Sequence, residues 1–125
     1  MKHLTIILAF LVTLSSPVVA RDANNPAVLR GTVTDVRDGD TIEVGGIAVR
    51  LSALDCPENG THQGNQATKI AQQFQGTQAQ CELTGAKSYD RLVGYCEIND
   101  VDFGSYMMNN SSCKVWEKYD VWDRY

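Results

Sequence analysis

The stretch Thr41-Ile42-Glu43-Val44-Gly45-Gly46-Ile47-Ala48-Val49-Arg50-Leu51 decides the fold of this chain. Apolar and polar residues alternate through Thr41–Val44 and again through Ile47–Leu51, which is the pattern of half-buried strands. Gly45-Gly46 joins the two runs and tolerates the positive φ angles of a tight hairpin turn. The sequence therefore predicts an antiparallel hairpin whose open end brings residue 40 close to residues 50–55.

Three further runs rich in strand-forming residues flank this hairpin, at 29–37, 80–84 and 92–98, with a loop at 85–90 between the last two. A helix is predicted over 64–75, because the apolar side chains of Ala67, Ile70, Ala71 and Phe74 recur at helical spacing. A second short helix is predicted over 101–110. Five strands with a helix between the third and fourth indicate a mainly β fold with α-helices (α+β), a five-stranded Greek-key barrel of the OB type.

Charged residues gather at the open end of the predicted hairpin. Asp40 begins its first strand, Arg50 lies near the end of its second, and Asp55 and Glu58 follow directly. Carboxylates hold a hard divalent cation through oxygen, and a guanidinium grips phosphate in a two-pronged fork. A further carboxylate can then handle water. This combination of residues suits a phosphodiester cleavage site.

These residues stand in a recognisable order: Asp38-Gly39-Asp40-Thr41, then Arg50-Leu51, then Asp55-Cys56-Pro57-Glu58, and later Tyr89-Asp90-Arg91. In this order the chain resembles the staphylococcal nuclease (thermonuclease) family, from about residue 31 to about residue 119. The resemblance implies a Ca²⁺-dependent nuclease that hydrolyses DNA or RNA to 3′-phosphate products. Two features depart from the family pattern. Asp90 replaces a glycine, and the chain ends at Tyr125, where the family continues into a long C-terminal helix.

The resemblance also implies a role for each site residue. Ca²⁺ would be held by Asp40, Asp55 and the backbone carbonyl of Cys56. The catalytic residues would be Arg50 and Arg91, which stabilise the pentacoordinate phosphorane, and Glu58, which acts as general base or orients the attacking water. Tyr89 would seat the nucleotide. Since Asp90 directly precedes Arg91, we expect its carboxylate to pair with the guanidinium that the reaction needs.

The N-terminal segment has the pattern of an export signal. A short basic start at Met1-Lys2-His3 precedes an apolar run and a small residue at Ala20, which predicts a signal peptide over 1–20 cleaved after Ala20. An uncleaved anchor is the alternative. We expect a disordered lead-in over 21–28, the nuclease-like domain over 29–119 and a C-terminal tail over 120–125. The mature protein would be secreted or periplasmic, monomeric, and without stable membrane association.

All four cysteines follow the predicted leader, and an even number in an oxidising compartment favours two disulfides. Zinc binding is the rival interpretation, but the sequence has no Cys-x-x-Cys pair and His62 is the one histidine after the leader. Cys81 and Cys96 lie on consecutive predicted strands and can face each other across an antiparallel pair. That leaves Cys56 and Cys113, whose segments run side by side in the family fold that the chain resembles.

The overall charge sets this chain apart from most nucleic-acid binders. It has 11 Lys and Arg against 15 Asp and Glu, a net charge of −4, which becomes −5 when Lys2 leaves with the leader. A broad basic surface is therefore absent from the composition, and we expect weak, salt-sensitive binding of single-stranded DNA or RNA at a local site. Two alternatives stay open, an inactive OB-type binding module and a disulfide-stapled envelope interaction protein.

Overall fold

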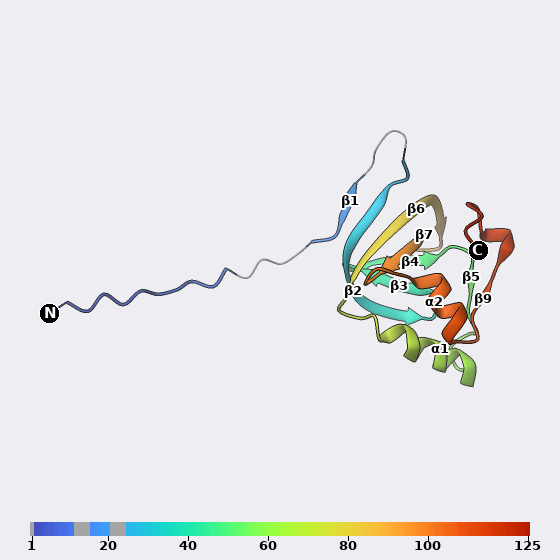
Figure 1. Cartoon of the computed structure of the whole chain (residues 1–125), viewed down its shortest axis with the longest axis horizontal. Helices are drawn as coiled ribbons and strands as arrows, with labels where there is room; N and C mark the ends of the chain where they lie inside the picture. The colour runs from blue at the N-terminus through green and yellow to red at the C-terminus, as the bar shows by residue number, and fades with distance from the viewer. Residues whose placement is uncertain (1, 12–15, 21–24) are drawn as a thin grey trace.

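A computed structural model of the chain describes residues 2–11, 16–20 and 25–125. It is mostly β with two helices, which confirms the predicted α+β class (Figure 1). Pairings between five strands close into a ring, in the order β2, β3, β4, β7, β6 and back to β2. Their bounds are Val28–Asp38 for β2, Thr41–Val44 for β3, Ile47–Leu51 for β4, Gln78–Ser88 for β6 and Arg91–Ile98 for β7.

The hairpin over residues 41–51 forms as predicted. β3 and β4 pair antiparallel with Thr41 opposite Arg50 and Val44 opposite Ile47. Gly45 and Gly46 in its turn have φ angles of 55° and 79°, the left-handed region in which a glycine is least strained. β4 then pairs with β7 in parallel, whereas the other pairs of the ring are antiparallel.

Both helices are present, with bounds that differ from the predicted ones. α1 spans His62–Gln72 and begins two residues early, because the side chain of Thr61 caps it by accepting a hydrogen bond from the Gly64 amide. α2 spans Phe103–Asn110, because Asp102 caps it by accepting from the Ser105 amide. α1 packs on β2, and α2 packs beside it on β7 (Figure 1).

The apolar stripe of the first helix forms part of the core, as its spacing indicated. Ala67 and Ala71 are fully buried, and Phe74 just beyond the helix packs edge-on against Phe103 with ring centroids 5.3 Å apart. Met107 is also fully buried, so it fills the core. The core therefore lies between the ring and the two helices.

Short strands complete the structure around the ring. β5 (Leu54–Asp55) pairs with β9 (Lys114–Val115), and β8 (Val101–Asp102) pairs with the end of β7. β6 is longer than the predicted 80–84, because after an irregularity it continues pairing with β7 to Ser88. The predicted loop over 85–90 is therefore only a two-residue turn at its far end.

Both expected disulfides are present. Cys81 and Cys96 are register partners on β6 and β7, and Cys56 joins Cys113 across 57 residues of sequence. The first pair staples two neighbouring strands. The second ties the segment after β5 to the segment after α2, next to the residues that the sequence marks for catalysis.

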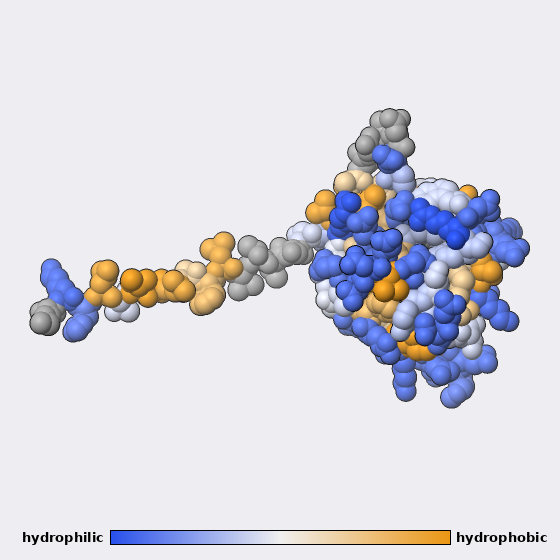
Figure 2. All heavy atoms as spheres, in the orientation of Figure 1, coloured by the Kyte–Doolittle hydropathy of each residue, from blue (hydrophilic) through white to orange (hydrophobic). Residues whose placement is uncertain are grey.

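The N-terminal region lies partly outside the described residues. β1 (Val18–Ala20), at the end of the predicted leader, pairs antiparallel with Val28–Arg30 of β2. The predicted lead-in falls on residues 21–24, outside the described part, and on 25–28, where Val28 already belongs to β2. No helix among the described residues is long and apolar enough to span a membrane. Figure 2 shows a mostly hydrophilic folded part beside a largely hydrophobic N-terminal trace.

The C-terminal segment packs on the sheet, although 120–125 was expected to be a tail outside the domain. A 3₁₀ helix, η1 (Glu117–Tyr119), leads to Asp120, whose buried carboxylate accepts hydrogen bonds from the Tyr95 hydroxyl at 2.7 Å and from the backbone amides of Arg124 and Tyr125. Trp122 stacks on Tyr95, with centroids 5.1 Å apart. The segment is therefore anchored to β7 by one carboxylate and one aromatic stack.

The Asp120→Asn variant should lower the free energy of unfolding by about 2 kcal/mol, since it weakens several hydrogen bonds to a buried charge. Asp123→Asn is the matched control, because it removes an equal charge from an exposed position of the same segment. Urea unfolding followed by tryptophan fluorescence measures both. An equal effect in the two variants would mean that Asp120 does not anchor the segment.

The same carboxylate predicts a pH dependence. Burial raises the pKa of Asp120, but the amides of Arg124 and Tyr125 and the Tyr95 hydroxyl outweigh it, so the pKa lies below the ordinary value. The Asp120 carboxylate therefore makes its full contribution to the free energy of unfolding above the unfolded pKa of about 3.9. This contribution is lost as pH falls through the lower pKa of the folded state.

Candidate active site

The start of β3 and the segment after β5 meet at the carboxylate of Asp40. The Asp40 carbonyl accepts from the Leu51 amide at 2.9 Å, and its Oδ2 accepts from the Cys56 amide at 3.0 Å. Asp38 caps the turn before β3, with its Oδ1 accepting from the Asp40 amide. These contacts bring residue 40 to the end of β4, as the hairpin pattern predicted, and its carboxylate to the Cys56 amide, whereas the Asp55 side chain is exposed.

Arg50 lies beside this carboxylate and is largely buried. Its Nη2 is 3.4 Å from Asp40 Oδ2, and its Nη1 donates to the carbonyls of Leu51 and Leu54 at 2.7 and 2.6 Å. The side chains of Arg50 and Asp40 are only 16% and 11% exposed. The guanidinium therefore closes the turn between β4 and β5 and also places positive charge next to Asp40.

Arg50 compensates the charge of Asp40 only in part. Burial, and then the hydrogen bond with Asp38, raise the pKa of Asp40 to about 7, although the positive charge of Arg50 acts in the opposite direction. A carboxyl group in this state has a strong preference for an additional cation, because a cation would stabilise the charged form.

The residues present fit the Ca²⁺ that the family resemblance implies. Asp40, Asp55 and the Cys56 carbonyl offer hard oxygen atoms of the kind Ca²⁺ prefers, and the hydrogen bond from the Cys56 amide joins the Asp40 carboxylate to the segment that holds the other two. Among the described residues no three His, Cys, Asp or Glu side chains cluster as a metal site. Water and phosphate oxygens would therefore complete the roughly six to eight ligands of the ion.

Arg91, the second candidate catalytic arginine, approaches the site from β7. Its Nη1 donates to the hydroxyl of the buried Thr41 at 2.9 Å, and its Nη2 donates to the Ser88 hydroxyl at 2.8 Å. Thr41 directly follows Asp40 and lies opposite Arg50, so the hydroxyl places the second guanidinium next to the first.

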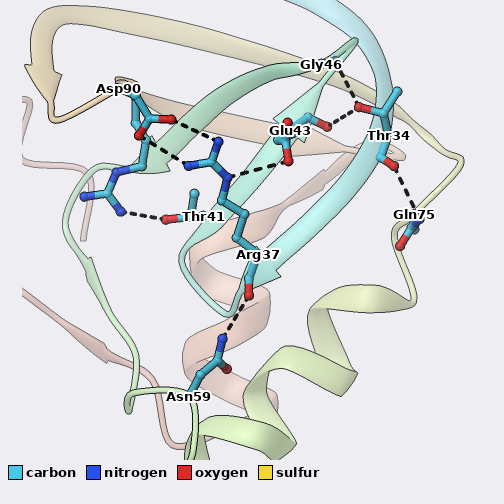
Figure 3. Close-up of polar contacts among 9 residues, drawn as sticks. Thr34, Arg37, Thr41, Glu43, Gly46, Asn59, Gln75 and Asp90 are labelled. Carbon is cyan, nitrogen blue, oxygen red and sulfur yellow. Dashed lines mark hydrogen bonds and ion pairs between the residues drawn. The ribbon is translucent and has the colours of Figure 1, made fainter.

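The expected pairing of Asp90 with Arg91 is wrong. The Asp90 carboxylate instead accepts two hydrogen bonds from Arg37, at 3.3 and 3.1 Å (Figure 3). Adjacent residues at the end of a hairpin turn point in different directions, so Asp90 faces β2 while Arg91 faces Thr41. The guanidinium of Arg91 thus has only uncharged hydrogen-bond partners among the described residues.

Glu58 and Tyr89 are less closely integrated. Both are exposed, Tyr89 to 95%, and among the described residues no hydrogen bond or ion pair joins the Glu58 side chain to Asp40, Arg50 or Arg91. The Tyr89 ring centroid lies 5.7 Å from the Arg91 guanidinium carbon. The structure therefore brings together Asp40, Arg50, Arg91 and the Cys56 backbone, and it leaves these two side chains at the rim.

The backbone of Glu58 is nevertheless firmly placed. Its carbonyl accepts from the Thr61 hydroxyl at 2.7 Å, and a Cβ at Gly64 would collide with the same carbonyl. The first turn of α1 therefore packs directly on the Glu58 loop, and only a glycine at position 64 allows this approach.

Two hollows flank β5 and divide the candidate residues between them. Arg50, Tyr89 and Arg91 line a pocket of about 540 Å³, whereas Asp55, Cys56 and Glu58 line a second hollow of about 510 Å³. Asp40 contacts a residue of each, namely Arg50 and Cys56.

The first pocket also contains residues that the sequence did not single out, Lys87, Trp116 and Tyr119. Trp116 and Tyr119 contact each other edge-on with centroids 4.4 Å apart, and both are more than 40% exposed. The aromatic character of the segment 116–125 was the available signal, but nothing local in the sequence places that segment beside β4 and β7.

No protein-family model matches this chain, and no curated protein matches it in sequence. The interpretation of the site therefore depends on its residues and their arrangement.

Ca²⁺ should raise the melting temperature of the mature protein, since an ion that binds only the folded state stabilises it by mass action. Asp40→Asn should abolish this shift, because the asparagine side-chain oxygen can still accept from the Cys56 amide but the side chain carries no negative charge. Asp35→Asn, an exposed aspartate on β2, is the control and should keep the shift. Differential scanning calorimetry with Ca²⁺ and with chelator decides, and an equal shift in Asp40→Asn would exclude this ion site.

Opening the Cys56–Cys113 disulfide should affect both stability and Ca²⁺ binding. The loop-entropy estimate is about 4 kcal/mol for this link and about 3 kcal/mol for Cys81–Cys96. The double Cys→Ser variant at 56 and 113 should also weaken Ca²⁺ binding, because the disulfide fixes the backbone segment whose carbonyl at position 56 belongs to the expected ion site. The double variant at 81 and 96 serves as the control and should retain Ca²⁺ affinity when folded. Calorimetric titration compares them, and equal affinities would separate the disulfide from the ion site.

Proposed function

We propose that the chain is a secreted or periplasmic, Ca²⁺-dependent nuclease that hydrolyses phosphodiester bonds of single-stranded DNA or RNA. We also propose that the ring of five strands is a barrel of the OB type. The observation that carries the proposal is that Arg50 pairs with the buried carboxylate of Asp40, that Arg91 donates to the hydroxyl of the next residue, Thr41, and that both arginines line one pocket. The order of these residues in the staphylococcal nuclease pattern supports the same function.

Guanidinium groups suit phosphate because they present parallel N–H donors and stay charged at all relevant pH values. Arg50 and Arg91 lie on neighbouring strands, with Arg50 in register with Val93, two residues beyond Arg91. In the proposed complex the two guanidinium groups contact different oxygens of one phosphate group and stabilise the charge that builds up as water attacks.

Hydrolysis then needs one proton acceptor and one proton for the leaving oxygen. In the proposed reaction Glu58 takes a proton from water as the water oxygen bonds to phosphorus. The bond from phosphorus to the 5′ oxygen breaks, Arg91 donates a hydrogen bond to that oxygen, and the oxygen takes up a proton from bulk water, while Glu58 later releases its proton to bulk water. The products are a 3′-phosphate and a 5′-hydroxyl. A Ca²⁺ ion held by Asp40, Asp55 and the Cys56 carbonyl would supply positive charge beside the phosphate oxygens.

The pocket around Arg50 and Arg91 favours an unpaired strand as substrate. Its aromatic side chains, Tyr89, Trp116 and Tyr119, can stack on bases that are not enclosed in a duplex. The net charge of −4 for the whole chain means that binding depends on this pocket, so affinity should be modest and should fall with added salt.

One observation favours a second candidate function, binding of nucleic acid without cleavage. Arg50 donates to two backbone carbonyls, and the Glu58 side chain has no described contact with the other site residues. In an OB-type binding module Arg50 would stabilise the turn after β4, and the aromatic pocket alone would hold the nucleic-acid strand. A cleavage assay separates the two functions.

The mature protein should cleave heat-denatured DNA or single-stranded RNA with Ca²⁺ and should lose this activity with chelator. Arg50→Ala and Glu58→Ala should each lower the rate by about two orders of magnitude or more, the scale of one electrostatic or acid–base contribution. Arg30→Ala is the control for charge, because Arg30 is exposed on β2 away from the pocket. Binding without cleavage in the wild type would favour the second function, and full activity in both variants would contradict the mechanism.

A further inference from the structure

We propose that Arg37 is a positioning residue, whose ion pair with Asp90 holds the β6–β7 turn and thereby sets Arg91 and Tyr89 over the proposed site. The inference rests on the proposed function and extends it to a residue outside the pocket. Position 90 is also where the chain departs from the glycine of the nuclease pattern, so the pair gives that departure a physical role.

The contact itself is two-pronged. Nη1 of Arg37 donates to Asp90 Oδ1 at 3.3 Å and Nη2 donates to Oδ2 at 3.1 Å, while Nε lies 3.5 Å from Glu43 Oε2 (Figure 3). The hydrogen bonds from Arg37 hold the pKa of Asp90 below its usual value. Glu43 lies on β3, so it fixes the guanidinium from the other side. Because both ends of the planar fork are engaged, the direction of the Arg37 side chain is defined.

The turn that Asp90 belongs to needs such a contact. Ser88 and Arg91 are register partners, so Tyr89 and Asp90 form a two-residue turn. Tyr89 has a φ of 59°, in the left-handed region that non-glycine residues adopt only at a cost. Its ring is almost wholly exposed, so burial of the ring does not offset the cost of this backbone conformation. Among the described contacts, the ion pair with Arg37 is the one that ties Asp90 to β2.

Arg37 reaches the second loop of the site through its backbone. Its carbonyl accepts from the Asn59 side-chain amide at 2.9 Å (Figure 3). Asn59 Oδ1 in turn accepts from the Thr68 hydroxyl of α1 at 2.6 Å. Asn59 directly follows Glu58. One residue at the end of β2 therefore contacts both the turn that carries Arg91 and the loop that carries Glu58.

Stability alone does not account for this arrangement. The side chains of Arg37 and Asp90 are 38% and 67% exposed, and exposed ion pairs contribute little to the free energy of unfolding. The pair should instead act on the placement of Arg91, where a shift of about 1 Å can change a rate by up to about a hundredfold.

The test uses two variants with opposite changes of charge, Asp90→Asn and Arg37→Gln. If the pair acts only through the local field on a polyanionic substrate, Asp90→Asn should lower KM, Arg37→Gln should raise it, and kcat should stay unchanged. If the pair positions Arg91, both variants should lower kcat by about tenfold. Asp90→Glu, which keeps a carboxylate, should recover part of the loss. Glu82→Gln is the matched control, because it breaks the exposed pair of Glu82 with Arg124, 2.9 Å apart, and should leave kcat unchanged.

A second measurement is independent of activity. Amide hydrogen exchange over residues 84–92 should be several-fold faster in Asp90→Asn and Arg37→Gln than in the wild type and in Glu82→Gln, because the turn loses its tie to β2. Exchange equal to the wild type would overturn the inference, even if the wild type hydrolyses nothing and the proposed function fails. Faster exchange with an unchanged kcat in an active wild type would overturn the positioning role.

Discussion

A buried carboxylate must find positive charge or hydrogen-bond donors, and at Asp40 this requirement organises the structure around it. The Cys56 amide and the Arg50 guanidinium both contact this carboxylate. The start of β3, the end of β4 and the segment after β5 are therefore joined at Asp40. Arg50 in turn closes the β4–β5 turn through two carbonyls. Burial nevertheless raises the pKa of Asp40 to about 7, so a cation bound beside this carboxylate would favour its charged form.

Much of the fold could be predicted from the sequence because its signals are local. Alternation and a Gly-Gly pair are enough to specify the hairpin of β3 and β4 with its register, and four apolar residues at helical spacing specify the buried face of α1. The Cys81–Cys96 link follows from the same reasoning, since neighbouring strands determine which side chains face each other. The convergence of residue 40 on residues 55 and 56 also follows from a single hairpin.

Other features depend on partners far away in the sequence, and no local pattern specifies them. Asp90 was expected to pair with its neighbour Arg91, but it pairs with Arg37, 53 residues away, because the turn directs the two side chains to different strands. The segment after residue 119 was expected to be an aromatic and charged tail outside the domain. Its anchor is one carboxylate that contacts Tyr95 across the sheet, and a single aspartate in a charged segment gives no sign of burial.

The parallel pairing of β4 with β7 has a consequence for when the site exists. Arg50 and Arg91 belong to strands separated by α1 and β6, so the two arginines meet only after most of the domain has been made and the ring has closed. Contacts between distant segments form slowly, because the entropy of closing a long loop must be overcome first. An unfolded chain therefore carries all the residues of the site but no site. If the chain is exported unfolded and is the nuclease proposed above, it would be inactive toward the nucleic acids of the compartment in which it is made.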